Sequence, residues 1–291
     1  MNLADQYTTL KPFLFAIAYN MTGQVQEAED IVQDAFTDVL IKQPEAVRSP
    51  KSFLTRIVMN KAIDRLGVLK KERERYPALW LPEPYITQRH GSDSTDILSY
   101  AFLHLLEALN PLERAVFILR EAFDHSYEDI AELCSITSEN CRQVLHRAKS
   151  KVTATPVKTM DKKESEAQAA ILKEFLSACL SNDPSRLKAV LKEDVVLYSD
   201  GGGKVIAARR ILSGISGVAK FIFGVVRKTF ENWSASKPVL VNDVPALFMP
   251  DGEGVYMVLI PHIEEGKVVK IFMMRNPDKI SFKSLSQNDQ A

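Results

Sequence analysis

Three amphipathic helices are predicted in residues 5–68, because apolar side chains recur there every three or four positions. The second helix has an acidic opposite face, and the third begins near Ser49 or Pro50, a serine and a proline typical of a helix start. The three apolar stripes are Leu10, Phe13, Leu14, Ile17 and Ala18, then Ala28, Ile31, Val32, Ala35, Phe36, Val39 and Leu40, then Phe53, Leu54, Ile57, Val58, Ala62, Ile63 and Leu66. These segments predict an all-α module.

A helix followed by a helix-turn-helix is predicted over residues 110–152. Asn110 and the proline after it form an N-cap and a first helical turn, and Glu113 stands at the capping-box position. Ser126 caps a short second helix, and Thr137 caps a third helix after a tight turn. The inner face of this third helix consists of Cys141, Val144, Leu145 and Ala148.

The outer face of the third helix is polar and basic: Ser138, Glu139, Arg142, Gln143, His146, Arg147 and Lys149. The N-terminal half of a recognition helix enters the major groove, so the first four of these side chains are candidates for contacts to base edges. Arg147, Lys149 and Lys151 are better placed for phosphates, which position a protein without specifying sequence. On this stretch alone, a surface helix with a solvated basic face remains the alternative.

Strand-like runs dominate the chain after a helix that starts at Glu164. The runs are VVLYS, KVIAA, KPVLVN, ALFMP, GVYMVLIPHI and KVVKIFMM, and a helix over residues 217–229 separates the early runs from the late ones. This order predicts an α+β domain in which helices pack on one face of a curved antiparallel sheet.

A linker is predicted from Lys70 to Ser94, where a charged run precedes YPALWLPEPY and its three prolines. Trp80 and Leu81 are unusual in a pure spacer. An apolar pair between prolines usually docks on a surface, so we interpret WLPEP as anchored rather than freely moving.

Charge is segregated along the chain, although the 291 residues have a net charge of zero. Residues 42–75 hold ten Lys and Arg against four Asp and Glu, whereas residues 26–38 hold five acids and no base. Any nucleic-acid surface must therefore be local, and the reversal suggests different partners for adjacent surfaces.

The three cysteines, Cys134, Cys141 and Cys179, fit neither a zinc spacing nor a disulfide framework. Cys134 and Cys141 fall on inner helix faces, where cysteine is usually a small buried apolar residue. The first residues lack the pattern of a signal peptide, and no segment is apolar enough to span a membrane. We expect a cytoplasmic protein without a cofactor or a metal.

Three segments together resemble a bacterial RNA polymerase sigma factor of the extracytoplasmic-function type. EAEDIVQDAFTDVL resembles the core-binding helix of sigma region 2, and SPKSFLTRIVMNKAIDRL resembles the helix that melts the promoter and reads the −10 element. The stretch from LNPLERAVF to HRAKSKV resembles sigma region 4, which reads the −35 element. The resemblance implies a factor that binds core RNA polymerase and directs promoter-specific initiation.

Three shorter motifs, WLPEP, DGGGK and NPDKI, resemble the SigJ-type subgroup, in which a SnoaL-like domain is fused to the C-terminus. The implied protein is multidomain, with two all-α modules followed by an α+β cone that regulates sigma activity. The expected boundaries are residues 1–69 for region 2, 70–95 for the linker, 96–153 for region 4, 154–163 for a hinge, 164–284 for the SnoaL-like domain and 285–291 for a tail.

The resemblance also assigns candidate residues. The candidates for binding polymerase are Glu27, Asp30, Gln33, Asp34 and Asp38, on the acidic helix face that the β′ coiled coil would meet. The resemblance also implies the β subunit as a partner. For −10 DNA they are Arg48, Ser52, Phe53, Arg56, Asn60, Lys61 and Arg65, with a base-flipping pocket in the loop at residues 45–52. For regulatory contacts they are Trp80, Leu81, Pro82, Glu83, Pro84, Asp200, Gly201, Gly202, Gly203, Lys204, Asn276, Pro277 and Asp278.

Some alternatives remain. Phe53 stands where the family commonly has tryptophan, which affects the expected melting contacts. The acidic helix face would also suit simple solvation, and DGGGK would suit a hairpin turn between VVLYS and KVIAA. The cone could instead host an enzyme or bind a small apolar ligand. Tyr198, Asp200, Tyr256 and His262 are the residues that could line such a cavity.

Overall fold

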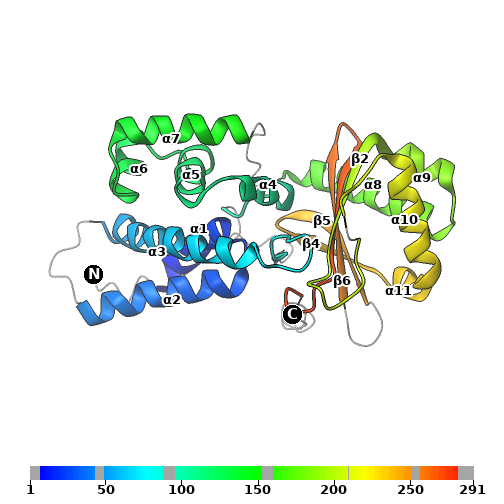
Figure 1. Cartoon of the computed structure of the whole chain (residues 1–291), viewed down its shortest axis with the longest axis horizontal. Coiled ribbons are helices and arrows are strands. Elements are labelled where there is room, and N and C mark those ends of the chain that lie inside the picture. Colours follow the sequence, from blue (N-terminus) through cyan, green and yellow to red (C-terminus); the bar gives the residue numbers. More distant parts are fainter. Residues whose placement is uncertain are drawn as a thin grey trace. The chain divides into compact units, whose positions relative to one another are not determined.

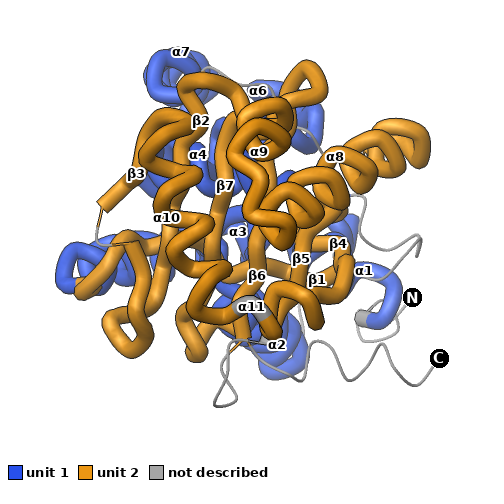
Figure 2. Tube along the Cα trace, turned by 90° about the vertical axis from the view of Figure 1, so that its right-hand side faces the viewer, with its two compact units in different colours: residues 1–75, 90–159 blue, residues 76–89, 160–291 orange. Residues whose placement is uncertain are grey.

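The computed structural model describes residues 7–42, 49–87, 96–152, 160–208, 210–250 and 256–280. They form two compact units. One unit contains helices α1 to α7. The other contains residues 76–87 of the predicted linker together with the chain from residue 160 onward, and Figure 2 draws this second unit in a single colour. The linker segment therefore belongs structurally to the C-terminal unit.

The first three helices of the N-terminal unit are α1 (Tyr7–Thr22), α2 (Val25–Lys42) and α3 (Pro50–Arg73). Ser49 caps α3 by accepting a hydrogen bond from the Ser52 amide, as the sequence predicts for a start near Ser49 or Pro50. The predicted inward stripes are buried or half-buried, except that Leu40 is 57% exposed. Leu40 stands one position after buried Val39, roughly 100° further around the helix, and so leaves the covered face.

The same unit continues through α4 (Tyr100–Leu105), η2 (Leu106–Ala108), α5 (Pro111–Phe117), the π-helical turn η3 (Ile118–Ala122), α6 (Tyr127–Leu133) and α7 (Ser138–Lys151). The predicted capping box of Asn110 and Glu113 is confirmed, and Ser126 caps α6 as predicted, in a second capping box with Asp129. Thr137 caps α7. The four residues predicted to lie on the inner face of α7 are buried, which confirms the helical phase.

The C-terminal unit contains the helices α8 (Lys162–Leu180), α9 (Pro184–Val190), α10 (Ile215–Lys228) and α11 (Phe230–Ser234), which lie on one face of a sheet (Figure 1). The strands are β1 (Ile86–Thr87), β2 (Leu191–Asp200), β3 (Leu212–Ser213), β4 (Lys237–Val241), β5 (Val244–Pro250), β6 (Tyr256–Glu264) and β7 (Lys267–Met274). Their order is β1-β4-β5-β6-β7-β2-β3, so a strand from the linker forms one edge of the sheet.

The sheet is mixed, which corrects the prediction of an antiparallel one. Strands β4 to β7 form antiparallel pairs, but β2 pairs with β7 in parallel, from Leu191 opposite Val268 to Asp200 opposite Met274. Parallel neighbours need a long crossover, which the chain between β2 and β7 supplies, and no local pattern in either strand reports its direction. The α+β fold with helices on one face is as predicted.

The predicted strand KVIAA is absent, because residues 204–208 lie in a turn and an irregular segment after β2. The outer edge of β2 pairs instead with Leu212–Ser213. Gly202 and Gly203 turn the chain with φ of 64° and 72°, values that favour glycine. The glycine run therefore ends β2 without forming a hairpin.

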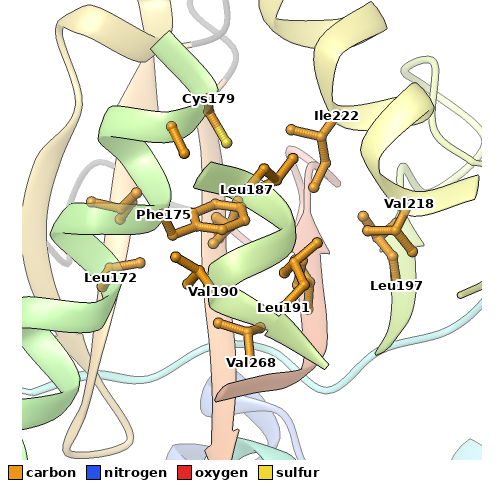
Figure 3. Close-up of a cluster of buried hydrophobic side chains, with 14 of the residues drawn as sticks. Leu172, Phe175, Cys179, Leu187, Val190, Leu191, Leu197, Val218, Ile222 and Val268 are labelled. Carbon is orange, nitrogen blue, oxygen red and sulfur yellow. The ribbon is translucent and has the colours of Figure 1, made fainter. Parts of the chain in front are cut away.

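An apolar core fills the space between the sheet and its helices (Figure 3). Phe175 and Cys179 of α8 pack with Leu187 of α9 and with side chains of β2 and β7, and Trp233 is fully buried in the same cluster. The three cysteines are all buried, as expected for apolar residues. None of the described helices is long and apolar enough to cross a membrane.

Candidate functional site

The outer face of α7 presents the polar residues predicted for base reading. Arg142, Gln143, His146 and Arg147 are exposed, and Ser138 is half-buried. The Arg142 guanidinium lies 4.9 Å from the centre of the Tyr127 ring and 3.8 Å from a Glu128 carboxylate oxygen. The ring limits the directions available to this side chain, which prepares it for a directed contact.

The basic end of α7 is partly engaged within the unit. Lys149 forms an ion pair with Glu121 at 2.9 Å, and Lys151 binds the nearly buried Glu113 carboxylate at 2.7 Å. Burial alone would raise the Glu113 pKa, but Lys151 and the Asn110 amide outweigh it and lower the pKa. Lys151 therefore helps to hold α7 against α5, while Arg147 stays available on the surface.

The acidic face of α2 meets the basic face of α3 directly. Arg65 donates two hydrogen bonds to Glu27, from Nε at 2.5 Å and from Nη2 at 2.6 Å. Lys61 Nζ lies 3.0 Å from Asp38 Oδ2, and its hydrogen bond lowers the Asp38 pKa. Two residues predicted for polymerase are thus paired with two predicted for −10 DNA.

The other candidates on these helices differ in accessibility. Asp30, Gln33 and Asp34 are exposed on α2, and Arg56 is exposed on α3. The Ser52 hydroxyl is 3.0 Å from that of Ser49, so it supports the start of α3. Phe53 and Asn60 are half-buried. Arg48 and the loop at residues 43–48 lie outside the described residues.

The linker is anchored on the C-terminal unit through one carboxylate. Asp200, at the end of β2, is fully buried and accepts four hydrogen bonds. Tyr76 Oη donates to Oδ1 at 2.6 Å, and the Leu81 amide donates to Oδ2 at 3.0 Å. The Gly202 amide and Lys279 Nζ supply the remaining two. A carboxylate has about four lone-pair sites, so Asp200 is saturated, and the prediction of an anchored linker is confirmed.

Lys279 is the cation of this cluster, which we call the linker clamp: Tyr76, Leu81, Asp200, Asn276 and Lys279. Its Nζ donates to Asp200 Oδ2 at 2.8 Å and to the Leu81 carbonyl at 2.7 Å. It also lies 4.3 Å from the centre of the Trp80 ring, and Asn276 donates to the Tyr76 hydroxyl. Burial raises the Tyr76 pKa, and the hydrogen bond to Asp200 raises it further.

The remaining residues of the three motifs have unequal roles. Leu81, Pro82 and Pro84 are buried, and Trp80 and Glu83 are half-buried. A Cβ on Gly203 would lie 2.6 Å from Pro77, and one on Gly202 would meet the Asn276 side chain. Lys204 forms an exposed ion pair with Asp278, and Pro277 is exposed. The predicted set therefore included Lys204 and missed Lys279 and Tyr76, although NPDKI contains Lys279.

A buried charge network joins the two helical modules of the N-terminal unit, and no local sequence pattern indicated it. Glu107 binds Arg73 at 2.6 Å and Arg114 at 2.5 Å, and Lys70 donates to its backbone carbonyl. Arg114 is fully buried and also donates to the Asn20 carbonyl. Burial acts to raise the Glu107 pKa, but the two guanidiniums outweigh it and lower the pKa. This network holds α3 and α5 in one unit.

Comparison with known proteins identifies the two helical modules. Residues 6–72 match the family model described as Sigma-70 region 2, and residues 99–152 match the model described as Sigma-70, region 4. The ECF RNA polymerase sigma factor SigJ of Mycobacterium tuberculosis is 30% identical over 97% of this chain and 95% of its own length. The chain belongs to the extracytoplasmic-function (ECF) RNA polymerase sigma factors.

One further relative and one solved structure cover the C-terminal unit as well. A probable ECF RNA polymerase sigma factor SigI of Mycobacterium tuberculosis is 26% identical over 93% of this chain and 92% of its own length. The crystal structure of the SigJ protein matches with a TM-score of 0.79 and 26% identity, and covers 97% of this chain and 98% of that one. This sigma factor therefore carries a fused SnoaL-like domain and directs promoter-specific transcription initiation with RNA polymerase.

The four residues considered for an active site or ligand cavity do not face the helix-covered core. Side chains alternate along a strand, and Leu197, Met257 and Leu259 belong to that core. Tyr198, Asp200 and Tyr256 therefore point to the opposite face, where Tyr198 stacks on Phe272. His262 is hydrogen-bonded to the exposed Glu264, and its pKa is lowered by burial.

Proposed function

We propose that this sigma factor binds polymerase and promoter DNA at separate sites. We also propose that the SnoaL-like domain sets the path of the linker between the region 2 and region 4 modules. The saturated Asp200 carboxylate carries the proposal, because two of its four donors come from the linker. A segment fixed in this way, here residues 76–87, has one span, whereas a free coil of the same length samples many. Together with the Glu107 network, the domain thereby restricts the separations that the two DNA-reading modules can adopt.

The −35 element is read from α7. Arg142 and Gln143 lie on its exposed N-terminal half, where a recognition helix meets base edges, and Arg147 is placed for a phosphate. The −10 element is bound by α3 through Arg56, Asn60, Lys61 and Arg65. Cationic side chains near an opened strand supply phosphate contacts without sequence preference.

Core polymerase docks on the acidic face of α2. Asp30, Gln33 and Asp34 are exposed there, and a negative surface suits a basic partner such as the β′ coiled coil. The β subunit is a further partner expected from the family resemblance alone. A factor that acts on polymerase and genomic DNA works in the cytoplasm, and no small ligand is required for the linker contact.

Transcription with core polymerase tests the proposal. Gly203→Ala should release the linker, because its Cβ would strike Pro77 and a left-handed backbone adds roughly 1–2 kcal/mol of strain. Gly266→Ala is the matched control, since Gly266 has φ of 75° but nothing within 4 Å of a Cβ. Run-off transcripts would be measured on promoter fragments whose spacing between the two elements is varied one base pair at a time.

The expected result is a changed spacing preference for Gly203→Ala and for a version truncated after about residue 165. Gly266→Ala should keep the preference of the unaltered protein. Identical spacing preferences in all four proteins would contradict control through the linker. Absence of promoter-specific initiation by both the full-length and truncated proteins would contradict the sigma function itself.

A further inference from the structure

The ion pairs between α2 and α3 join two surfaces that have separate partners in the proposed function. Glu27 and Asp38 belong to the polymerase face, whereas Arg65 and Lys61 belong to the DNA face, and each carboxylate holds one cation. Lys61 and Arg65 therefore have protein partners in the isolated chain. A phosphate that binds either cation has to compete with a carboxylate already in contact.

These pairs are exposed enough to exchange. The side chains of Lys61 and Asp38 are 31% and 37% exposed, and those of Arg65 and Glu27 are 38% and 19% exposed. Ion pairs in such positions contribute little net stability, since water solvates both partners when they separate. The network around Glu107 differs, because Arg114 is fully buried and has no route to an outside partner without unfolding.

Acidic neighbours on α2 differ from Glu27 and Asp38 in this respect. Asp34 and Glu29 are exposed and form no ion pair within the described part of the chain. Asp30 accepts a hydrogen bond from Gln26, not from a cation. Only some of the carboxylates on this helix therefore restrain cations of α3.

From these contacts we propose that polymerase and promoter DNA are coupled by partner exchange. Polymerase takes Glu27 and Asp38 as its own anionic contacts, and this docking releases Arg65 and Lys61 to bind the phosphates of the −10 strand. The isolated protein consequently binds the strand weakly, and polymerase makes it competent. By thermodynamic linkage, DNA bound to Lys61 and Arg65 raises the affinity of the protein for polymerase by the same factor. The inference rests on the proposed polymerase and −10 sites.

Salt dependence of binding to single-stranded DNA tests the exchange. Full-length protein without polymerase would be titrated with a fluorescent mixed-sequence oligonucleotide at several salt concentrations. Each released cation that meets a phosphate steepens the slope of log K against log salt by about 0.7 for single strands. Asp38→Asn should steepen the slope by about that amount and raise affinity several-fold at low salt.

Two control variants and one further test variant enter the same titration. Glu29→Gln changes net charge as Asp38→Asn does but breaks no pair, so its slope should equal that of the unaltered protein. Lys61→Met combined with Asp38→Asn should cancel the gain, since the released cation is gone. Glu27→Gln should steepen the slope in the same direction but by less, because Arg65 still has Glu72 at 3.9 Å. Circular dichroism would show whether each variant is folded. If Glu27→Gln is unfolded, the test rests on Asp38→Asn.

A polymerase-binding titration separates this inference from the proposed function. Asp34→Asn should weaken polymerase binding and leave the DNA slope unchanged, whereas Asp38→Asn should weaken polymerase binding and steepen the slope. Equal DNA slopes for Asp38→Asn and Glu29→Gln would overturn the exchange while the sigma function stands. A steeper slope with undiminished polymerase binding would also overturn it, because the carboxylate would then not be the shared contact. If the unaltered protein does not bind polymerase, the proposed function fails.

Discussion

The buried ion pair of the linker clamp offers a direct test of how the linker is held. Asp200 is fully buried, Lys279 is 9% exposed, and their charged atoms lie 2.8 Å apart. At an effective dielectric constant near 20, their attraction is about 6 kcal/mol, and the cost of removing both charges from water opposes much of it. Loss of one partner leaves a buried charge unpaired, which typically costs about 3–5 kcal/mol.

We therefore expect Asp200→Asn and Lys279→Met each to destabilise the C-terminal unit by about 3–5 kcal/mol. The double variant should recover most of this loss, because neither charge then remains buried. Domains of this size have only about 5–15 kcal/mol of stability, so each single change removes a large share. With a urea slope of about 1–3 kcal/mol per M, the midpoint should fall by roughly 1–5 M.

Tryptophan fluorescence reports this unit selectively, because the two tryptophans of the chain are Trp80 in the linker and Trp233 in the core. Trp80→Phe leaves only the core reporter, and Trp233→Phe leaves only the linker reporter. In the Asp200→Asn background the linker reporter should change at lower urea than the core reporter, because the linker loses its main anchor. Urea midpoint shifts below about 0.3 M in both single variants would refute the reasoning. A double variant whose loss of stability equals the sum of the two single losses would also refute it.

Three further outcomes follow from the same contacts. Glu107→Gln should destabilise the N-terminal unit, as measured by amide hydrogen exchange in α5, and its deficit should shrink on acidification. Folding lowers the Glu107 pKa from its usual 4.5, so the stability that the ionised carboxylate supplies is present at neutral pH and is lost as the pH falls through the folded-state pKa. A deficit that does not change with pH would contradict this electrostatic cause. Cys134 should resist alkylation until the protein unfolds, because burial raises its pKa to about 12, and rapid native labelling by mass spectrometry would argue against that burial. Arg142→Ala should cost about 1–3 kcal/mol at one base pair of the −35 element, whereas Arg147→Ala should weaken binding to all sequences alike, and a binding assay across mutated sites distinguishes the two.

Features that depend on nearby residues were predictable from the sequence. The caps at Asn110, Ser126 and Thr137 each pair with a residue three positions later, so one short motif contains both partners. The phase of α7 follows in the same way from its apolar positions. The anchoring of WLPEP was predictable because Trp80 and Leu81 are too apolar for a solvated spacer.

Features that depend on distant residues were not predictable. Lys204 is the lysine of the DGGGK motif and was therefore included among the regulatory contacts. The cation that binds Asp200 is instead Lys279, 79 positions away. The segment KVIAA has the composition of a strand. In the folded unit it follows left-handed glycines, and the Ile206 carbonyl accepts a hydrogen bond from Arg275 instead of a ladder partner.

Burial decides which of the ion pairs are structural and which can exchange, and burial is a property of the fold. The pairs Lys279–Asp200 and Arg114–Glu107 are enclosed, so separating either pair would leave an unpaired charge in the interior, which strongly destabilises the fold. The pairs Lys61–Asp38 and Arg65–Glu27 join the same residue types at similar distances but remain open to solvent. The enclosed pairs therefore hold the linker and the helical modules in place, while the open pairs supply the charges with which a sigma factor meets polymerase and DNA.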